Sequence, residues 1–209
     1  MTNITMLLGF VLSTSSWAGE RSLTVCLAPS QTVEYDQILA QAKGYATRLY
    51  RSIGLDLRWK ATCSSIELET LGTLSAPNLS TIGVEWVATA PVTLPAGARA
   101  SARPFQTTGI RITLYQDRIF LLLKENHRGA AVLGHVLAHE IGHVLLGHNA
   151  HGRKGLMQPA WSNLEQSAMR HTPMAFTSEE AESIRRRLDD RSVMLAGVSG
   201  QTPEFPKRL

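Results

Sequence analysis

The sequence contains only two cysteines, Cys26 and Cys63, among its 209 residues. Neither belongs to a CxxC pair and neither lies near the histidine-rich part of the chain, which argues against a zinc site built from thiolates. In an oxidising compartment the two could form a disulfide that stabilises the fold by restricting the unfolded chain. The alternative is a pair of buried free thiols.

No stretch of the chain combines clustered basic residues with aromatic ones, although the formal net charge is +4. The densest basic run, 185–187, lies beside Asp189 and Asp190 in a predicted helix, and we interpret it as a solvated helix face. We therefore expect no nucleic-acid partner. Hydrophobic residues at 44% and charged residues at 18% are typical of a globular protein, and the length suits one domain.

The amino-terminal segment lacks Lys and Arg, which most secretory signals carry before their apolar core. Its apolar run, Ile4–Leu12, is too short to span a bilayer as a mature helix. Small residues at Ser16 and Ala18 flank a plausible cleavage point. We predict a signal peptide at 1–18 and a secreted or periplasmic protein with no membrane span in the mature chain. An atypical signal, or a true start elsewhere, accounts for the missing basic residues.

The most informative stretch is HEIGH, which begins at His139 and ends at His143. Gly129–Leu146 is apolar and free of Pro, so it predicts a helix that ends at Gly147. Residues four apart lie on one helical face, which lets both imidazoles bind one metal ion while Glu140 stays unbound beside it. This pattern predicts a zinc site with Glu140 as general base.

A catalytic zinc ion needs a third protein ligand and an open fourth position. Two histidines follow the helix end, His148 and His151. We favour His151, because His148 comes directly after Gly147 and has little chain in which to turn toward the metal. His135, one turn before His139, is interpreted as a hydrogen-bonded core or surface residue, with contact to the ligands or the substrate as the alternative.

The segment HEIGHVLLGHNAHGRKGLMQP resembles the active-site segment of the metzincin zinc proteases, HExxHxxGxxH followed by a Met-turn. It departs from that pattern at Gly147, which lies four residues after His143, and at Asn149, which stands where the third His is expected. The part from Gly147 to Trp161 is also similar to uncharacterised bacterial secreted proteins. The resemblance implies an α+β, zincin/metzincin-like fold: a small twisted mixed sheet, a backing helix and a central zinc-binding helix. It also implies that Met157 forms an apolar floor under the ligands, and that an edge strand lines the cleft.

Periodicity predicts the remaining elements of one domain, residues 19–191. A strand, a helix and a strand form a parallel βαβ unit with a right-handed crossover. Two further strands follow, separated by a long surface loop, and the segment after them is either helix or strand. A capping box begins a last helix, which ends near Leu188 before a loose tail at 192–209. In chain order these elements are Ser22–Leu27, Asp36–Ile53, Leu55–Lys60, Thr81–Thr89, the loop Ala90–Thr108, Ile110–Tyr115, the ambiguous Gln116–Asn126, and the capping box of Thr177 and Glu180.

These features predict a monomeric zinc metalloendopeptidase that hydrolyses peptide bonds in peptide or protein substrates. A zinc-bound water would be the nucleophile and Glu140 would activate it. Two alternatives use the same residues. One is a zinc-stabilised binding module whose metal is closed by a fourth protein ligand, and the other is a zinc hydrolase that acts on a non-peptide amide.

Overall fold

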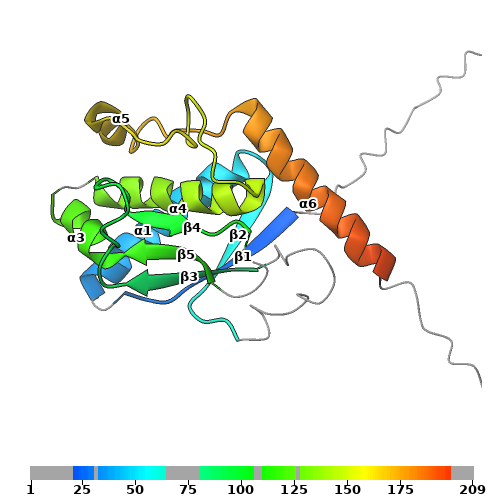
Figure 1. Cartoon of the computed structure of the whole chain (residues 1–209), viewed down its shortest axis with the longest axis horizontal. Helices are drawn as coiled ribbons and strands as arrows, with labels where there is room; N and C mark the ends of the chain where they lie inside the picture. Colours follow the sequence, from blue (N-terminus) through cyan, green and yellow to red (C-terminus); the bar gives the residue numbers. More distant parts are fainter. Residues whose placement is uncertain (1–20, 31–32, 65–80, 106–109, 126–127, 199–209) are drawn as a thin grey trace, which may run out of the picture.

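The computed structural model describes residues 21–30, 33–64, 81–105, 110–125 and 128–198. The predicted signal peptide lies outside these ranges. The described chain forms a five-stranded sheet in the order β2-β1-β3-β5-β4, in which only the pairing of β4 with β5 is antiparallel. The fold is therefore a mixed α/β arrangement around a mostly parallel sheet, with helices packed against it (Figure 1).

The predicted βαβ unit is confirmed. Strand β1 (Arg21–Leu27) pairs in parallel with β2 (Leu55–Lys60), and α1 (Val33–Arg51) connects them. Gly54 allows the chain to turn between α1 and β2, because it adopts the left-handed conformation with φ 78°. Alternate residues of β1 are fully buried, as expected for a strand with one face in the core.

Strands β3 (Thr81–Val87) and β5 (Ile110–Tyr115) agree with the prediction, but the long surface loop between them was only partly right. Three of its residues form β4 (Ala100–Ala102), which pairs with β5 and makes an edge of the sheet. A strand this short has no periodicity of its own. Its pairing depends on β5, which no local signal in the loop reveals.

Helix α3 (Gln116–Glu125) resolves the ambiguity after β5 in favour of helix. Its first turn also holds the remaining loop in place. The Asp117 carboxylate accepts the backbone N–H of Ala90, and the Arg118 guanidinium donates to the carbonyls of Pro95 and Ala98. The loop is therefore tied to the start of α3.

Helix α4 (Gly129–Leu146) matches the predicted range and is buried along its whole length. Its length and apolarity would also suit a membrane span, but here it packs inside the domain. In Figure 1 it lies between the sheet and α5 (Asn163–Ala168), a short helix that was not predicted. Gly147 ends α4 with φ 69°, and its N–H donates to the carbonyl of His143, as predicted for a left-handed cap.

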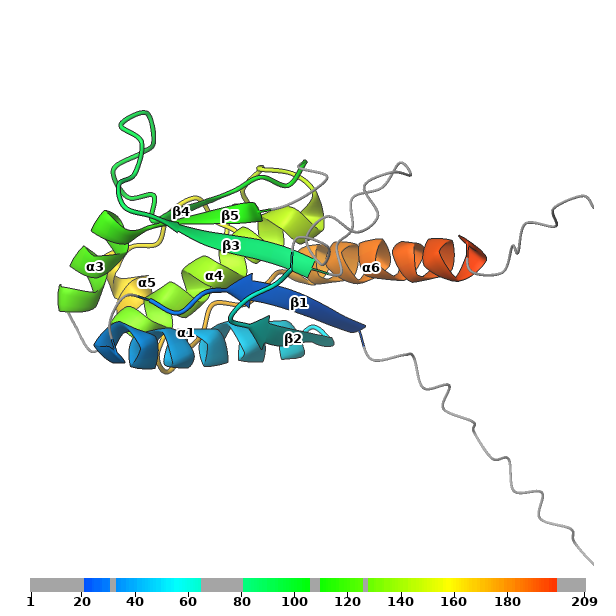
Figure 2. The same cartoon turned by 90° about the horizontal axis from the view of Figure 1, so that it is seen from below.

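Helix α6 (Ser178–Val198) begins with the predicted capping box. Glu180 Oε2 accepts the Thr177 N–H at 2.8 Å, and the Thr177 hydroxyl accepts the Glu180 N–H at 3.2 Å. The expected end near Leu188 was wrong, since residues 192–198 continue the helix; the rest of the tail lies outside the described residues. Figures 1 and 2 show α6 extending beyond the end of the sheet.

The basic run on α6 is not simply a solvated face. Arg187 donates to the carbonyl of Leu146 at 2.9 Å, and Arg185 reaches the carbonyl of Ile53 at 3.5 Å. Only Arg186 behaves as expected, exposed and 3.9 Å from Glu182 one turn away. Arg187 therefore connects α6 to the end of α4, and Arg185 connects it to the turn that follows α1.

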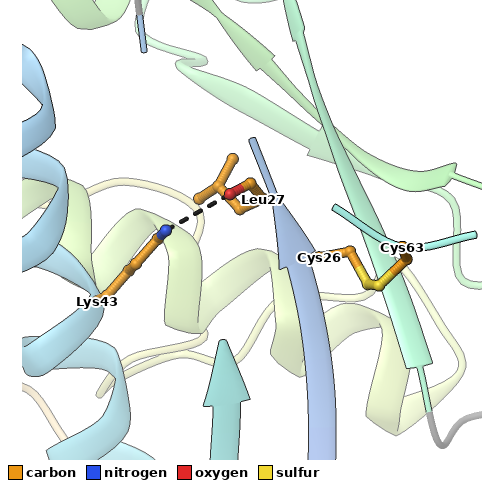
Figure 3. The surroundings of a disulfide bond; sticks show 4 residues. All are labelled: Cys26, Leu27, Lys43 and Cys63. Atoms are coloured by element: carbon orange, nitrogen blue, oxygen red, sulfur yellow. Dashed lines mark hydrogen bonds between the residues drawn. A yellow bond between two sulfur atoms is a disulfide. The ribbon is translucent and has the colours of Figure 1, made fainter. Parts of the chain in front are cut away.

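Cys26 and Cys63 form a disulfide with their Cα atoms 5.8 Å apart, within the usual range (Figure 3). The bond joins β1 to the segment that follows β2. On the helical side of the same strand, Lys43 Nζ donates to the carbonyl of Leu27 at 3.4 Å. Of the two alternatives left open for the cysteines, the disulfide is the one found.

Candidate metal centre

Helix α4 carries four buried polar residues in an otherwise apolar sequence: His135, His139, Glu140 and His143. Burying polar groups is costly unless each finds a partner. The segment that returns over α4 after its glycine end supplies partners for three of the four. These contacts determine which atom of each ring faces the site.

The two histidines of HEIGH each use Nδ1 to bond a backbone carbonyl. His139 Nδ1 lies 2.8 Å from the carbonyl of Leu156, and His143 Nδ1 lies 3.0 Å from that of His148. A carbonyl only accepts, so both bonds require the proton on Nδ1. Each Nε2 is then unprotonated and keeps its lone pair, as in metal-ligating histidines whose other nitrogen is held by a carbonyl.

The two Nε2 atoms are 3.0 Å apart. Three close contacts, two to carbonyls and one between the rings, would each need a hydrogen, but two neutral imidazoles carry only two. Two lone pairs therefore face each other. A cation between the rings removes this conflict, and two nitrogens on a tetrahedral zinc ion are about 3.3 Å apart. The pair thus fits a metal ion with little adjustment.

His151 completes the group. One ligand atom from each of His139, His143 and His151 lies within 4.8 Å of the others, and His151 is the exposed member. His148 is not in this group; its backbone carbonyl orients His143 instead. The structure therefore brings together the three histidines chosen from the sequence. Among the residues that the structure describes, no fourth His, Cys, Asp or Glu joins them.

Burial dominates the electrostatics of the site. It lowers the pKa of His143 to about 4, assisted by repulsion from His139, and lowers the pKa of His139 and His151. Neutral imidazoles are the form that binds metals, so the site favours ligation over protonation.

Glu140 is 8% exposed, and burial raises the pKa of its carboxyl to about 8. Helical geometry places it about 100° around the axis from His139, beside the ligand face and not on it. A cation held by the histidines would lower the pKa of Glu140, because an opposite charge nearby favours the carboxylate. Within the described chain, no hydrogen bond or ion pair engages this side chain.

Met157 is 1% exposed and packs against α4 at Gly142. A Cβ at Gly142 would lie 2.6 Å from Met157 Sδ and 3.2 Å from Phe176 Cε1, so the glycine is what lets the sulfur approach. The carbonyl that orients His139 belongs to Leu156, the residue before Met157. The turn around Met157 therefore orients His139 through its backbone, and the Met157 side chain fills the space beside Gly142 of α4.

His135 is fully buried and hydrogen-bonded, as interpreted from the sequence. Its Nδ1 donates to the carbonyl of Ala131 at 2.7 Å, and its Nε2 accepts the N–H of Met174 at 3.1 Å. Trp161, for which no role was predicted, packs edge-on against both His135 and His139, with its ring centroid 6.3 and 5.6 Å from theirs. His135 thus attaches the segment after Met157 to the helix and is not a ligand.

No protein-family model matches the sequence, and no curated protein matches it. Among solved structures, the crystal structure of archaemetzincin from Methanopyrus kandleri at 1.5 Å resolution is similar. The two chains superpose with a TM-score of 0.49 and share 17% sequence identity, and the match covers 84% of this chain and 99% of the archaemetzincin chain. A likeness this remote does not establish the chemistry of this chain, and the metzincin-like architecture stays a prediction.

Proposed function

We propose that this chain is a zinc-dependent metallopeptidase. The observation that carries the proposal is that His139, His143 and His151 each bring a ring nitrogen within 4.8 Å of the others. The Nε2 atoms of His139 and His143 are 3.0 Å apart, and the protons of these two rings are held at Nδ1. Three imidazoles without thiolate suit zinc, and three protein ligands leave one position open, as in catalytic zinc sites.

When bound, zinc would act as a Lewis acid and lower the pKa of water at the open position. Glu140 would accept a proton on its carboxylate from the attacking water and donate it to the amide nitrogen of the leaving chain. General acid–base assistance of this kind contributes about 10²- to 10⁴-fold. The buried position of Glu140 suits a proton carrier, because burial opposes permanent charge and the nearby cation opposes permanent protonation.

Strand β4 is the last strand of the sheet in the described chain, and its outer side is the surface that we propose binds an extended peptide. Tyr115 N–H donates to the carbonyl of Arg99, and Arg103 N–H donates to the carbonyl of Arg111. Arg99 and Arg103 therefore turn their backbone groups toward β5, and by alternation the N–H and C=O groups of Ala100 and Ala102 point away from β5. A substrate strand could pair with them, as peptides do at open sheet edges.

We also propose that the protein is exported and acts as a monomer. The disulfide between Cys26 and Cys63 supports export, because such bonds persist mainly in oxidising compartments.

The missing fourth ligand within the described residues favours the peptidase over a zinc-stabilised binding module, since structural sites occupy all four positions.

The test compares Glu140→Gln with the wild type. The variant should keep one zinc per chain, measured by elemental analysis, and lose at least about 100-fold in cleavage of a denatured, fluorescently labelled protein. Wild-type activity in Glu140→Gln would refute the mechanism. A wild-type protein that binds zinc, cleaves no peptide and hydrolyses simple amides would point to the non-peptide alternative.

The ligand set is tested with a matched pair of variants. His151→Ala should lose most of the zinc, whereas His148→Ala should retain it, because alanine preserves the carbonyl that orients His143. The reverse result would make His148 the third ligand.

A further inference from the structure

The five-residue step from Gly147 to Gly152 carries His151 and connects α4 to the turn around Met157. Both of its ends are glycines, and both face α6. At each glycine a side chain of α6 occupies the space that a Cβ would need. The third ligand therefore sits on a segment whose two ends contact the same helix.

At the first end the contact is Arg187. A Cβ on Gly147 would lie 2.6 Å from Arg187 Nη1 and 2.7 Å from Cζ, so the guanidinium lies directly over the glycine. The same group donates to the carbonyl of Leu146 at 2.9 Å. A cation at a helix C-terminus also interacts favourably with the helix dipole. Arg187 thus fixes the point at which the chain leaves α4.

At the second end the contact is Glu180. A Cβ on Gly152 would lie 2.8 Å from Glu180 Oε1. The carboxylate cannot swing away freely, because its other oxygen accepts the N–H of Thr177 in the capping box. From the other side, Gly152 donates its N–H to the carbonyl of Met157 at 2.8 Å. The glycine next to His151 is therefore held between α6 and the turn around Met157.

Helix α6 can serve as a support because the core holds it firmly. Arg21 of β1 makes two bonds to the carboxylate of Asp189, at 2.6 and 2.7 Å. Ile184 is fully buried and Ala181 is 6% exposed. The helix is thus held by the Arg21 pair on β1, by burial in the apolar interior and by packing on α4.

We propose that Arg187 and Glu180 are positioning residues of the metal centre, which hold the two ends of the segment that carries His151. His139 and His143 are oriented by α4 and by backbone carbonyls, whereas His151 is exposed and depends on its segment. Loss of either α6 contact should free the third ligand first. The inference rests on the proposed metal centre but does not require peptidase activity.

The first test compares two single variants, each of which loses one positive charge, at adjacent positions of α6. Arg187→Gln should weaken zinc binding about 10-fold, the lower end of the range for residues that orient ligands, in competition with a chromophoric chelator. Arg186→Gln loses the same charge from the exposed neighbour and should stay within about 2-fold of wild type. Arg187→Lys keeps a donor for the Leu146 carbonyl and should restore most of the affinity. Equal effects at 186 and 187, or unchanged affinity in Arg187→Gln, would overturn the proposal.

The second test uses Gly152→Ala, which should lower the zinc affinity when Glu180 is present and raise it when Glu180 is replaced by alanine. Gly152→Ala places a methyl group against Glu180 and should weaken zinc binding. Glu180→Ala should also weaken it, but adding Gly152→Ala to that variant fills the vacated space and should recover part of the affinity. The same effect of Gly152→Ala in both backgrounds would show that the Glu180 contact plays no role.

Visible absorption of the cobalt(II)-loaded proteins gives a readout that altered folding alone would not produce. Arg187→Gln should change the ligand-field bands, whereas Arg186→Gln should not, and circular dichroism of the metal-free variants confirms that each is folded. Unaltered bands in Arg187→Gln would count against positioning. A wild-type chain that binds zinc but cleaves no peptide would refute the proposed peptidase and leave these affinity tests unaffected.

Discussion

Replacing Gly134 by alanine should destabilise the protein, although the same change usually stabilises a helix. Gly134 lies in the middle of α4, where α1 crosses it. A Cβ at this position would lie 2.7 Å from the backbone carbonyl oxygen of Ala42 and closer still to Tyr45 Cβ. Both atoms belong to rigid parts of α1. The two helices would therefore have to separate by about 0.5 Å or more to restore ordinary contact distances.

The magnitude follows from two opposing effects. Overpacking a well-packed core costs about 1–3 kcal/mol, and the short distances to rigid atoms place this site in the upper part of that range. Replacing glycine by alanine within a helix stabilises the folded state by about 1 kcal/mol through helix propensity. The net loss should be about 1–2 kcal/mol, which lowers the melting temperature by about 2–8 °C for a protein of this size.

Gly44→Ala provides the matched control on the partner helix α1. Its Cβ would meet only Arg48 Nη1, at 3.6 Å, an ordinary contact. This variant should gain about 0.5–1 kcal/mol. Thermal unfolding of both variants and the wild type, with chelator present to exclude metal binding, tests the pair. A Gly134→Ala protein as stable as wild type, or a destabilised Gly44→Ala protein, would refute this account of how α1 packs on α4.

Three further results are expected. Burial lowers the pKa of His135, so the folded state binds fewer protons than the unfolded state; stability should be full above about pH 6.5 and fall as the pH drops below it. His135→Gln, which can still accept the Met174 N–H, should lose less stability over that window in chemical denaturation, and an unchanged pH dependence would contradict the assignment. Replacing both Cys26 and Cys63 by serine should cost about 2–4 kcal/mol, and a loss below 0.5 kcal/mol would show that the bond contributes little. Zinc at about 100 times its dissociation constant should raise the free energy of unfolding by about 2.7 kcal/mol, and a His151→Ala protein that gains as much would argue against its role as a ligand.

Local patterns predicted the elements that local interactions determine. The apolar run of α4 and the glycine that ends it gave the correct helix, and alternation gave β2 and β5 with correct ends. The His-Glu-His spacing placed two imidazoles on one helical face, because the rise and twist of a helix are nearly constant. The capping box of Thr177 and Glu180 was found for the same reason: its bonds connect residues only three apart.

Elements that depend on distant partners were missed or incomplete. The three residues of β4 lie in a Pro-rich loop and form a strand only because β5 lies alongside them. Helix α5 is a single short helix, whose capping box at Ser162 and Glu165 was the available signal. Arg187 looked like part of a solvated face, since nothing near it in the chain shows that the end of α4 lies beside α6.

The sequence by itself therefore determined the donor types, the spacing of His139 and His143, and the free position of Glu140, since all three follow from helix geometry. Tertiary structure decided which later histidine joins the group, which nitrogen of His139 and of His143 faces it, and which residues contact the segment that carries His151. Those outcomes depend on where the chain travels after Gly147. That path is set by contacts with Leu156, Met157 and helix α6, and these parts come together only when the whole chain folds.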